Sequence, residues 1–183
     1  MGLMALGNMR HGARRRHLHL FDSFEGIPEP DETVDGERAI REVRSVGGGT
    51  AGKLVPVGNF YERYADGVGT LETNRHLMEG VIRYDPSFLH YHKGWFQDIL
   101  PREAGNTREI AILRLDGDWY ASTLVCLEHL YRNVVSGGFV IIDDYGYYEG
   151  CRKAVDDFLE QEGIRPYLNH IDAAGRYWIK SGG

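Results

Sequence analysis

The chain has 183 residues, enough for one domain with a hydrophobic core and too few for two ordinary domains. Hydrophobic residues make up 42% and charged residues 26% of it, which excludes a disordered, collagen-like or coiled-coil chain. A formal net charge of −6 argues against binding to the phosphate backbone of a nucleic acid.

The first half of the chain predicts strands and helices separated by long loops. Residues 17–22 (HLHLFD) alternate in hydropathy and end in an acid, as expected of a strand followed by a loop. Residues 71–82 carry apolar side chains at helical spacing. The remaining elements are a helix at 37–46, a flexible glycine stretch at 47–52 and a strand at 87–92.

The second half is more regular. Residues 109–115 (EIAILRL) and 139–142 are apolar runs typical of strands buried on both faces. We expect helices at 122–133, ending before Gly137 and Gly138, and at 150–162, then a hairpin of strands at 165–171 and 176–180. This alternation predicts one α/β domain over residues 1–183, with a doubly wound, mostly parallel sheet and an antiparallel C-terminal edge.

Carboxylates follow the two most apolar strands. Asp116 and Asp118 come directly after one, and Asp143 and Asp144 directly after the next. If these strands are neighbours, their acids converge at the sheet edge where α/β folds bind ligands. Crowded carboxylates suit Mg²⁺ or Ca²⁺. The alternative is that the acids cap helices, which fits Asp118 better than the other three.

Three other features allow more than one interpretation. Asp22 ends the first strand, where an acid binds ribose hydroxyls in nucleotide-binding folds or simply forms a turn. Residues 47–54 (GGGTAGKL) nearly match a phosphate-binding loop, but Leu54 replaces the required hydroxyl and no buried strand precedes them. His90 and His92 share one face of a strand, and without a visible third ligand they favour packing over zinc binding.

Five segments occur in an order that resembles one known family. They are residues 20–31 (LFDSFEGIPEPD), 93–101 (KGWFQDILP), 113–123 (LRLDGDWYAST), 137–146 (GGFVIIDDYG) and 151–158 (CRKAVDDF). Together they resemble the macrocin O-methyltransferase family, S-adenosylmethionine-dependent enzymes that methylate sugar hydroxyls of natural products. The resemblance covers about residues 18–180, with a divergent, flexible insert at 33–70.

The resemblance implies a Rossmann-like class I methyltransferase fold and roles for particular side chains. The cofactors implied are S-adenosylmethionine and Mg²⁺. The residues implied are Asp116, Asp143 and Asp144 as Mg²⁺ ligands, Asp116 also as general base, Asp22 and Ser23 at the cofactor ribose, and Phe96 and Gln97 at its adenine. The general base and the metal would together activate a hydroxyl that is a poor nucleophile near pH 7.

The N-terminal end departs from the family pattern. The family begins with a strand and a glycine-rich turn, whereas residues 1–16 predict the tail of a first helix and a turn. We therefore expect the domain to lack its first strand and glycine motif, which would leave the neighbours of that central strand with unpaired edges.

The leading functional prediction is a Mg²⁺-assisted O-methyltransferase acting on a sugar or polyhydroxylated natural product, or on a catechol. The alternatives are an inactive truncated remnant, or oligomerisation module, of the same fold, and phosphoryl transfer through residues 47–54. With only Cys126 and Cys151, no ~20-residue apolar run and no signal-peptide core, we expect a cytoplasmic protein. The expected partner is a small molecule, not nucleic acid or membrane, and homo-oligomerisation stays open.

Overall fold

The computed structural model describes residues 1–58, 60–61 and 69–182. Part of the insert predicted at 33–70 falls on residues 59 and 62–68 and so lies outside the described residues. None of the described helices has the length and apolar character needed to cross a membrane.

The first half of the chain builds a two-stranded parallel sheet. Strand β1 (Leu18–Asp22) pairs with β2 (Leu89–Lys93), as the alternation in both segments predicts. Helix α1 (Gly2–His11) packs on one face of this pair, around a small core that includes Ala5 and Leu20. Helix α3 (Leu71–Arg75) continues into a π-helical turn that contributes Met78 to the same core.

The second half builds a four-stranded sheet in the order β3-β4-β6-β5. Its parallel pair is β3 (Ile110–Leu115) and β4 (Val134–Ile142), and β6 (Arg176–Ile179) runs antiparallel to β4 and to β5 (Asn169–His170). The α/β class and the antiparallel C-terminal edge are therefore confirmed, although the first strand of the hairpin is shorter than predicted.

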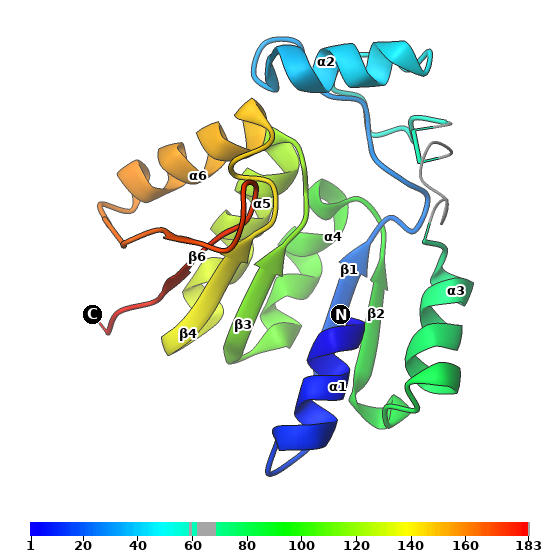
Figure 1. Cartoon of the computed structure of the whole chain (residues 1–183), viewed down its shortest axis with the longest axis vertical. Helices are drawn as coiled ribbons and strands as arrows, with labels where there is room; N and C mark the ends of the chain where they lie inside the picture. The colour runs from blue at the N-terminus through cyan, green and yellow to red at the C-terminus, as the bar shows by residue number, and fades with distance from the viewer. Residues whose placement is uncertain (59, 62–68, 183) are drawn as a thin grey trace.

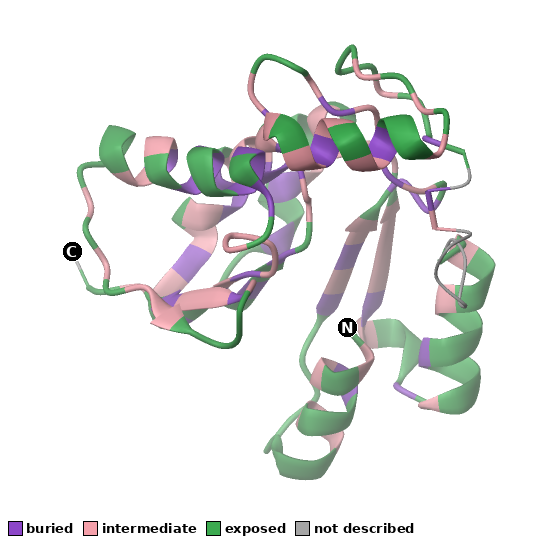
Figure 2. Ribbon diagram, turned by 45° about the horizontal axis from the view of Figure 1, so that its top comes forward, coloured by how far each residue is buried: buried purple, intermediate pink, exposed green. Residues whose placement is uncertain are grey.

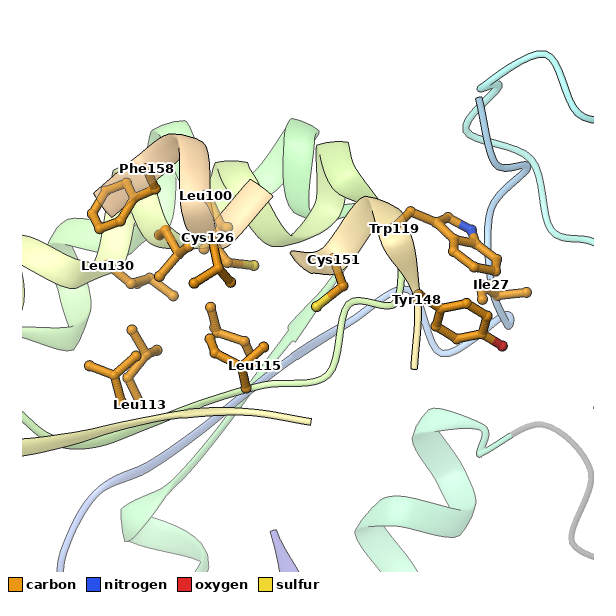
Figure 3. Close-up of a cluster of buried hydrophobic side chains, with 14 of the residues drawn as sticks. Ile27, Leu100, Leu113, Leu115, Trp119, Cys126, Leu130, Tyr148, Cys151 and Phe158 are labelled. Carbon is orange, nitrogen blue, oxygen red and sulfur yellow. The ribbon is translucent and has the colours of Figure 1, made fainter. Parts of the chain in front are cut away.

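Three helices cover one face of the four-stranded sheet (Figure 1). They are α4 (Phe96–Glu103), α5 (Tyr120–Leu130) and α6 (Glu149–Gln161). Elsewhere in the chain, short 3-10 turns lie at Pro86–Phe88, Ala104–Thr107 and Tyr131–Asn133. Between helices and sheet lies the main core, where Leu113, Cys126 and Phe158 are among the buried side chains (Figure 3). Each fully buried large apolar side chain there contributes about 1.5–3 kcal/mol of transfer free energy.

The prediction that strands 109–115 and 139–142 are buried on both faces was wrong. Leu113 and Val140 face the helices and are buried, but Ile112 is 49% and Phe139 40% exposed. Their side chains alternate across the sheet, and among the described residues no helix covers the second face of β3 and β4.

The Gly137-Gly138 pair lies inside β4 rather than at the end of the preceding helix. Gly137 has φ +79°, which a residue with a side chain adopts at a cost. A Cβ on Gly138 would lie 2.8 Å from the carbonyl oxygen of Val135. The pairing of β3 with β4 also shifts register between Ile110 and Ile112, so the glycines accommodate an irregularity in the sheet.

The two sheets are separate, with β1 and β3 at their facing edges (Figures 1 and 2). Neither strand has a second neighbour among the described residues. The expectation of unpaired edges at these two strands is therefore confirmed within the described part of the chain.

Helix α2 (Gly36–Ser45) is tied to the rest of the fold by Asp35 just before it. This residue is 2% exposed, and its carboxylate accepts the N–H groups of Asp31 at 2.7 Å and Tyr120 at 2.6 Å. A Cβ on Gly150 would lie 2.2 Å from the same carboxylate, so glycine is required there. Asp35 thus joins the loop before α2 to the start of α5.

We expect Asp35→Ala to lower the free energy of unfolding by about 2–3 kcal/mol, because two backbone N–H groups lose their acceptor. Urea denaturation followed by circular dichroism measures this change. The matched control is Asp31→Ala, since the carboxylate of Asp31 bonds Thr33 within its own exposed turn. Equal stability of Asp35→Ala and the unchanged protein would refute the prediction.

Candidate active site

The acids that follow β3 and β4 meet at the C-terminal edge of the sheet. The N–H group of Asp143 donates to the carbonyl of Leu115 at 3.0 Å, which extends the pairing of the two strands into the loops. The carboxylate oxygens of Asp116, Asp118 and Asp144 offer three ligand atoms within 4.8 Å of one another. That spacing permits a hard divalent cation to bind between them after a small contraction.

Burial and mutual repulsion dominate the electrostatics of this carboxylate cluster (Asp116, Asp118 and Asp144). Burial, followed by the charges of Asp116 and Asp143, raises the pKa of Asp144 to about 7. Burial, followed by the charges of Asp144 and Asp116, raises the pKa of Asp118 well above its ordinary value. Oδ2 of Asp144 is buried and has no hydrogen-bond partner in the described structure. An unpaired buried oxygen among repelling carboxylates fits a cation ligand.

Asp143, predicted with Asp116 and Asp144, lies beside the cluster and contacts a cation of the protein. The guanidinium of Arg114 donates to Asp143 at 2.7 Å and to Asp116 at 2.8 Å. Among the predicted metal ligands, the structure therefore brings Asp116 and Asp144 closest together, with Asp118 as the third member.

Asp118 was not among the predicted metal ligands, yet it belongs to the carboxylate cluster. Its interpretation as a helix cap is not supported, because α5 begins after Trp119 without a side-chain cap bond. Asp118 instead has φ +54°, a left-handed conformation that turns the chain between β3 and α5. The signal available in the sequence was the spacing of two acids around Gly117, directly after a buried strand.

A cleft of about 400 Å³ joins the carboxylates to the residues predicted at the cofactor. Its lining includes Asp22, Ser23, Phe96, Asp116 and Asp118. Residues from β1, α4 and the β3–α5 loop, far apart in the sequence, thus face one space.

Asp22 and Ser23 form the β1 side of this cleft. Oδ1 of Asp22 accepts the N–H of Phe24 at 2.6 Å, which leaves its second oxygen available to a ligand. Burial raises the pKa of Asp22. The hydroxyl of Ser23 donates to the carbonyl of Gly26 at 2.9 Å, so this side chain shapes the loop around the cleft.

Gln97 follows Phe96 at the start of α4 but does not line the cleft itself. Its Oε1 atom is buried and has no hydrogen-bond partner among the described residues. A buried acceptor without a donor fits a ligand that carries an N–H group, such as the amino group of an adenine.

Residues 47–54 lie outside this site and do not form a phosphate-binding loop. They follow helix α2 rather than a strand, and no helix begins after Lys53 as the phosphate-binding motif requires. In the described structure, the near match to a phosphate-binding loop is therefore a chance one, and the alternative of phosphoryl transfer through it is not supported.

The chain is similar to a family model and to several known proteins. A family model described as macrocin O-methyltransferase (TylF) matches residues 79–180. The 8-demethyl-8-(2,3-dimethoxy-alpha-L-rhamnosyl)-tetracenomycin-C 4'-O-methyltransferase of Streptomyces olivaceus is 37% identical over 171 residues, which cover 92% of this chain and 56% of that protein. Demethyldecarbamoylnovobiocin O-methyltransferase of Streptomyces niveus is 33% identical over 174 residues, covering 93% and 58%.

A solved structure shows the same architecture. The O-methyltransferase NovP superposes with a TM-score of 0.75 at 31% identity, covering 99% of this chain and 66% of that one. The chain thus spans less than two thirds of the length of the relatives it matches.

Proposed function

Because the chain belongs to the macrocin O-methyltransferase family, we propose that it transfers the methyl group of S-adenosylmethionine to a hydroxyl of a sugar or polyhydroxylated natural product, assisted by Mg²⁺. Its fold is the class I methyltransferase fold. Two relatives are O-methyltransferases whose names contain rhamnosyl-tetracenomycin and novobiocin units, which supports an acceptor of this class.

One observation carries the proposal: a single cleft joins Asp22 and Phe96 to Asp116 and Asp118. A methyl transfer needs the donor and the acceptor oxygen in line and in contact, which a shared cleft provides. Asp22 would bind the ribose hydroxyls, while Phe96 and the unpaired Oε1 of Gln97 would face the adenine.

Asp116 and Asp144 would hold Mg²⁺, since they belong both to the predicted ligand set and to the carboxylate cluster. Asp143 is the third predicted ligand, and its contact with Arg114 holds it beside them. When bound, the ion would lower the pKa of a coordinated acceptor hydroxyl.

The proton of the acceptor hydroxyl needs a carboxylate in the cleft. The family resemblance assigns this role to Asp116, whose negative charge Arg114 neutralises at 2.8 Å. Asp118 also lines the cleft, and burial raises the pKa of its carboxyl, so the carboxylate is a stronger base than an ordinary aspartate once it is ionised. We propose that Asp118 takes the proton and that Asp116 binds the metal.

Calorimetric titration of the purified chain with S-adenosylmethionine, with and without Mg²⁺, tests the proposal. We expect a dissociation constant in the micromolar range, equivalent to about −8 kcal/mol. Absence of binding would contradict it and would favour the inactive remnant, an alternative that the unpaired edges of β1 and β3 support.

The Asp22→Asn variant should bind S-adenosylmethionine about 10- to 100-fold more weakly, because a charge-assisted hydrogen bond to the ribose is lost. The amide oxygen of asparagine can still accept the N–H of Phe24, so the loop should keep its shape. Glu25→Gln is the matched control, since Glu25 pairs with Lys93 at the surface. Equal affinity in both variants would remove Asp22 from the cofactor site.

A further inference from the structure

Four histidines gather on the face of the β1–β2 sheet opposite α1. His17 and His19 come from the first strand segment, and His90 and His92 from β2. The strands are parallel with His19 opposite His90, so the histidines form two cross-strand pairs. We call His19 and His92 the inner pair, and His17 and His90 the outer pair. The sequence showed no third ligand beside His90 and His92, and the sheet brings His17 and His19 next to them.

Three of the four ring nitrogens of His19 and His92 form a chain of hydrogen bonds. Nδ1 of His92 lies 2.5 Å from Oε2 of Glu103 on α4, and a carboxylate accepts only, so this nitrogen carries the proton. Nε2 of His92 is then the acceptor, and Nδ1 of His19 donates to it at 3.0 Å. Both nitrogens of His92 and Nδ1 of His19 are therefore engaged within the protein.

The outer pair has no such anchor. Nδ1 of His17 and Nε2 of His90 lie 2.8 Å apart, and no other hydrogen bond to either ring occurs in the described structure. His17 is exposed and His90 is partly exposed, so an ion and its water ligands can reach both nitrogens.

The outer pair is held in position by rings on both sides. The ring of His17 packs against Phe88, with centroids 4.8 Å apart. The ring of His90 stacks on His19 at 4.5 Å with an interplanar angle of 16°, and His19 is fixed through His92. Both imidazoles are thus oriented before any ligand arrives, which lowers the entropic cost of binding.

We propose that His17 and His90 form a chelating site for one divalent transition-metal ion, separate from the carboxylate cluster. With metal–nitrogen bonds of about 2.0–2.1 Å, nitrogens 2.8 Å apart subtend an angle of about 90° at the ion. This is the angle between neighbouring positions in the tetragonal or octahedral shells of Cu²⁺ and Ni²⁺, for which imidazole is a preferred ligand.

The charge state of the site agrees with this ligand set. Burial, followed by the charges of His17 and His92, lowers the pKa of His90, so its ring is neutral at pH 7. When both nitrogens bind the ion, the proton that lies between Nδ1 of His17 and Nε2 of His90 moves to the opposite nitrogen of its ring. Carboxylate ligands, by contrast, favour Mg²⁺, so the two sites select different ions.

Calorimetric titration of the untagged chain with Ni²⁺ at pH 7.5, in excess Mg²⁺ to occupy the carboxylates, tests the site. We expect one ion per chain with a dissociation constant on the order of 1–100 µM. His17→Gln and His90→Gln should each weaken Ni²⁺ binding at least tenfold. Even a residue that only hydrogen-bonds to a metal ligand contributes about 10- to 100-fold to metal affinity. His170→Gln, at an exposed histidine of β5, should leave it unchanged.

Electron paramagnetic resonance of the Cu²⁺-loaded chain provides a second readout that does not depend on affinity. Coupling to two imidazole nitrogens is expected, and to one in His90→Gln. Circular dichroism shows whether each variant is folded, and His17→Gln, at an exposed position, is the variant least able to disturb the core. Three results would overturn the proposal. They are no binding below millimolar Ni²⁺, binding as strong in His17→Gln and His90→Gln as in the unchanged protein, and binding lost only in His92→Gln.

Discussion

The Asp118→Asn variant is expected to lose methyl transfer by about 10²- to 10⁴-fold, the usual contribution of a general base. Asparagine keeps the shape of the side chain but cannot take a proton from the acceptor hydroxyl. The affinity for S-adenosylmethionine should stay within about threefold, because Asp22 remains. The affinity for Mg²⁺ should fall less than in Asp116→Asn, because Asp116 and Asp144 remain as the proposed ligands. Turnover with a sugar-bearing acceptor, measured beside calorimetry of both cofactors, separates these effects.

Asp116→Asn provides the comparison that distinguishes the two carboxylates. It should lose Mg²⁺ affinity together with turnover, since Asp116 is proposed as a metal ligand. Asp157→Asn, at a partly exposed aspartate on α6 that pairs with Lys153 and accepts the hydroxyl of Tyr120, should change neither quantity. If Asp118→Asn kept full turnover, the role of proton acceptor would return to Asp116.

The Asp144→Asn variant is expected to make the metal-free protein more stable at pH 8, by about 1–2 kcal/mol after allowance for solvent screening of a partly exposed carboxylate. The pKa of Asp144 is about 7 in the folded protein against an ordinary value of 3.8. The folded state therefore binds this proton more tightly than the unfolded state does. Stability from the protonated form is complete below about pH 4 and is lost as the pH rises towards 7.

Above pH 7 the native aspartate is ionised among other carboxylates, whereas asparagine carries no charge. A change of 1–2 kcal/mol corresponds to a rise in Tm of about 2–8 °C for a chain of this size. Added Mg²⁺ should stabilise the unchanged protein and have little effect on Asp144→Asn. Thermal melts of both proteins at pH 5 and pH 8, with and without Mg²⁺, measure these changes in Tm. A lower Tm for Asp144→Asn than for the unchanged protein at pH 8 would contradict the prediction.

The Tm of Asp144→Asn without Mg²⁺ and its response to added Mg²⁺ together relate the stability of the fold to ion binding. A carboxylate that destabilises the empty fold and is needed to bind the ion is expected at a site selected for activity rather than for stability. Asp157→Asn again serves as the control. Lys153 holds the pKa of the Asp157 carboxyl below its usual range, so replacing Asp157 by asparagine should not stabilise the fold.

The amino-acid sequence by itself determined most of the local structure. Apolar runs predicted β3 and β4, and helical spacing predicted α5 and α6. The alternation of these elements predicted a parallel sheet, and β3 and β4 pair in parallel. These predictions succeeded because period and turn chemistry are local properties of the chain. The family also followed from the order of five segments, as the matching family model confirms.

Only the tertiary structure decided which side chains meet and which faces stay open. Asp118 joins the carboxylate cluster instead of capping α5, because its backbone adopts a left-handed turn. Ile112 is exposed because coverage of a strand depends on neighbouring elements, not on its own apolarity. His17 meets His90 across 73 residues only because two parallel strands align. Contacts between distant residues depend on strand register and helix packing, which no local pattern encodes.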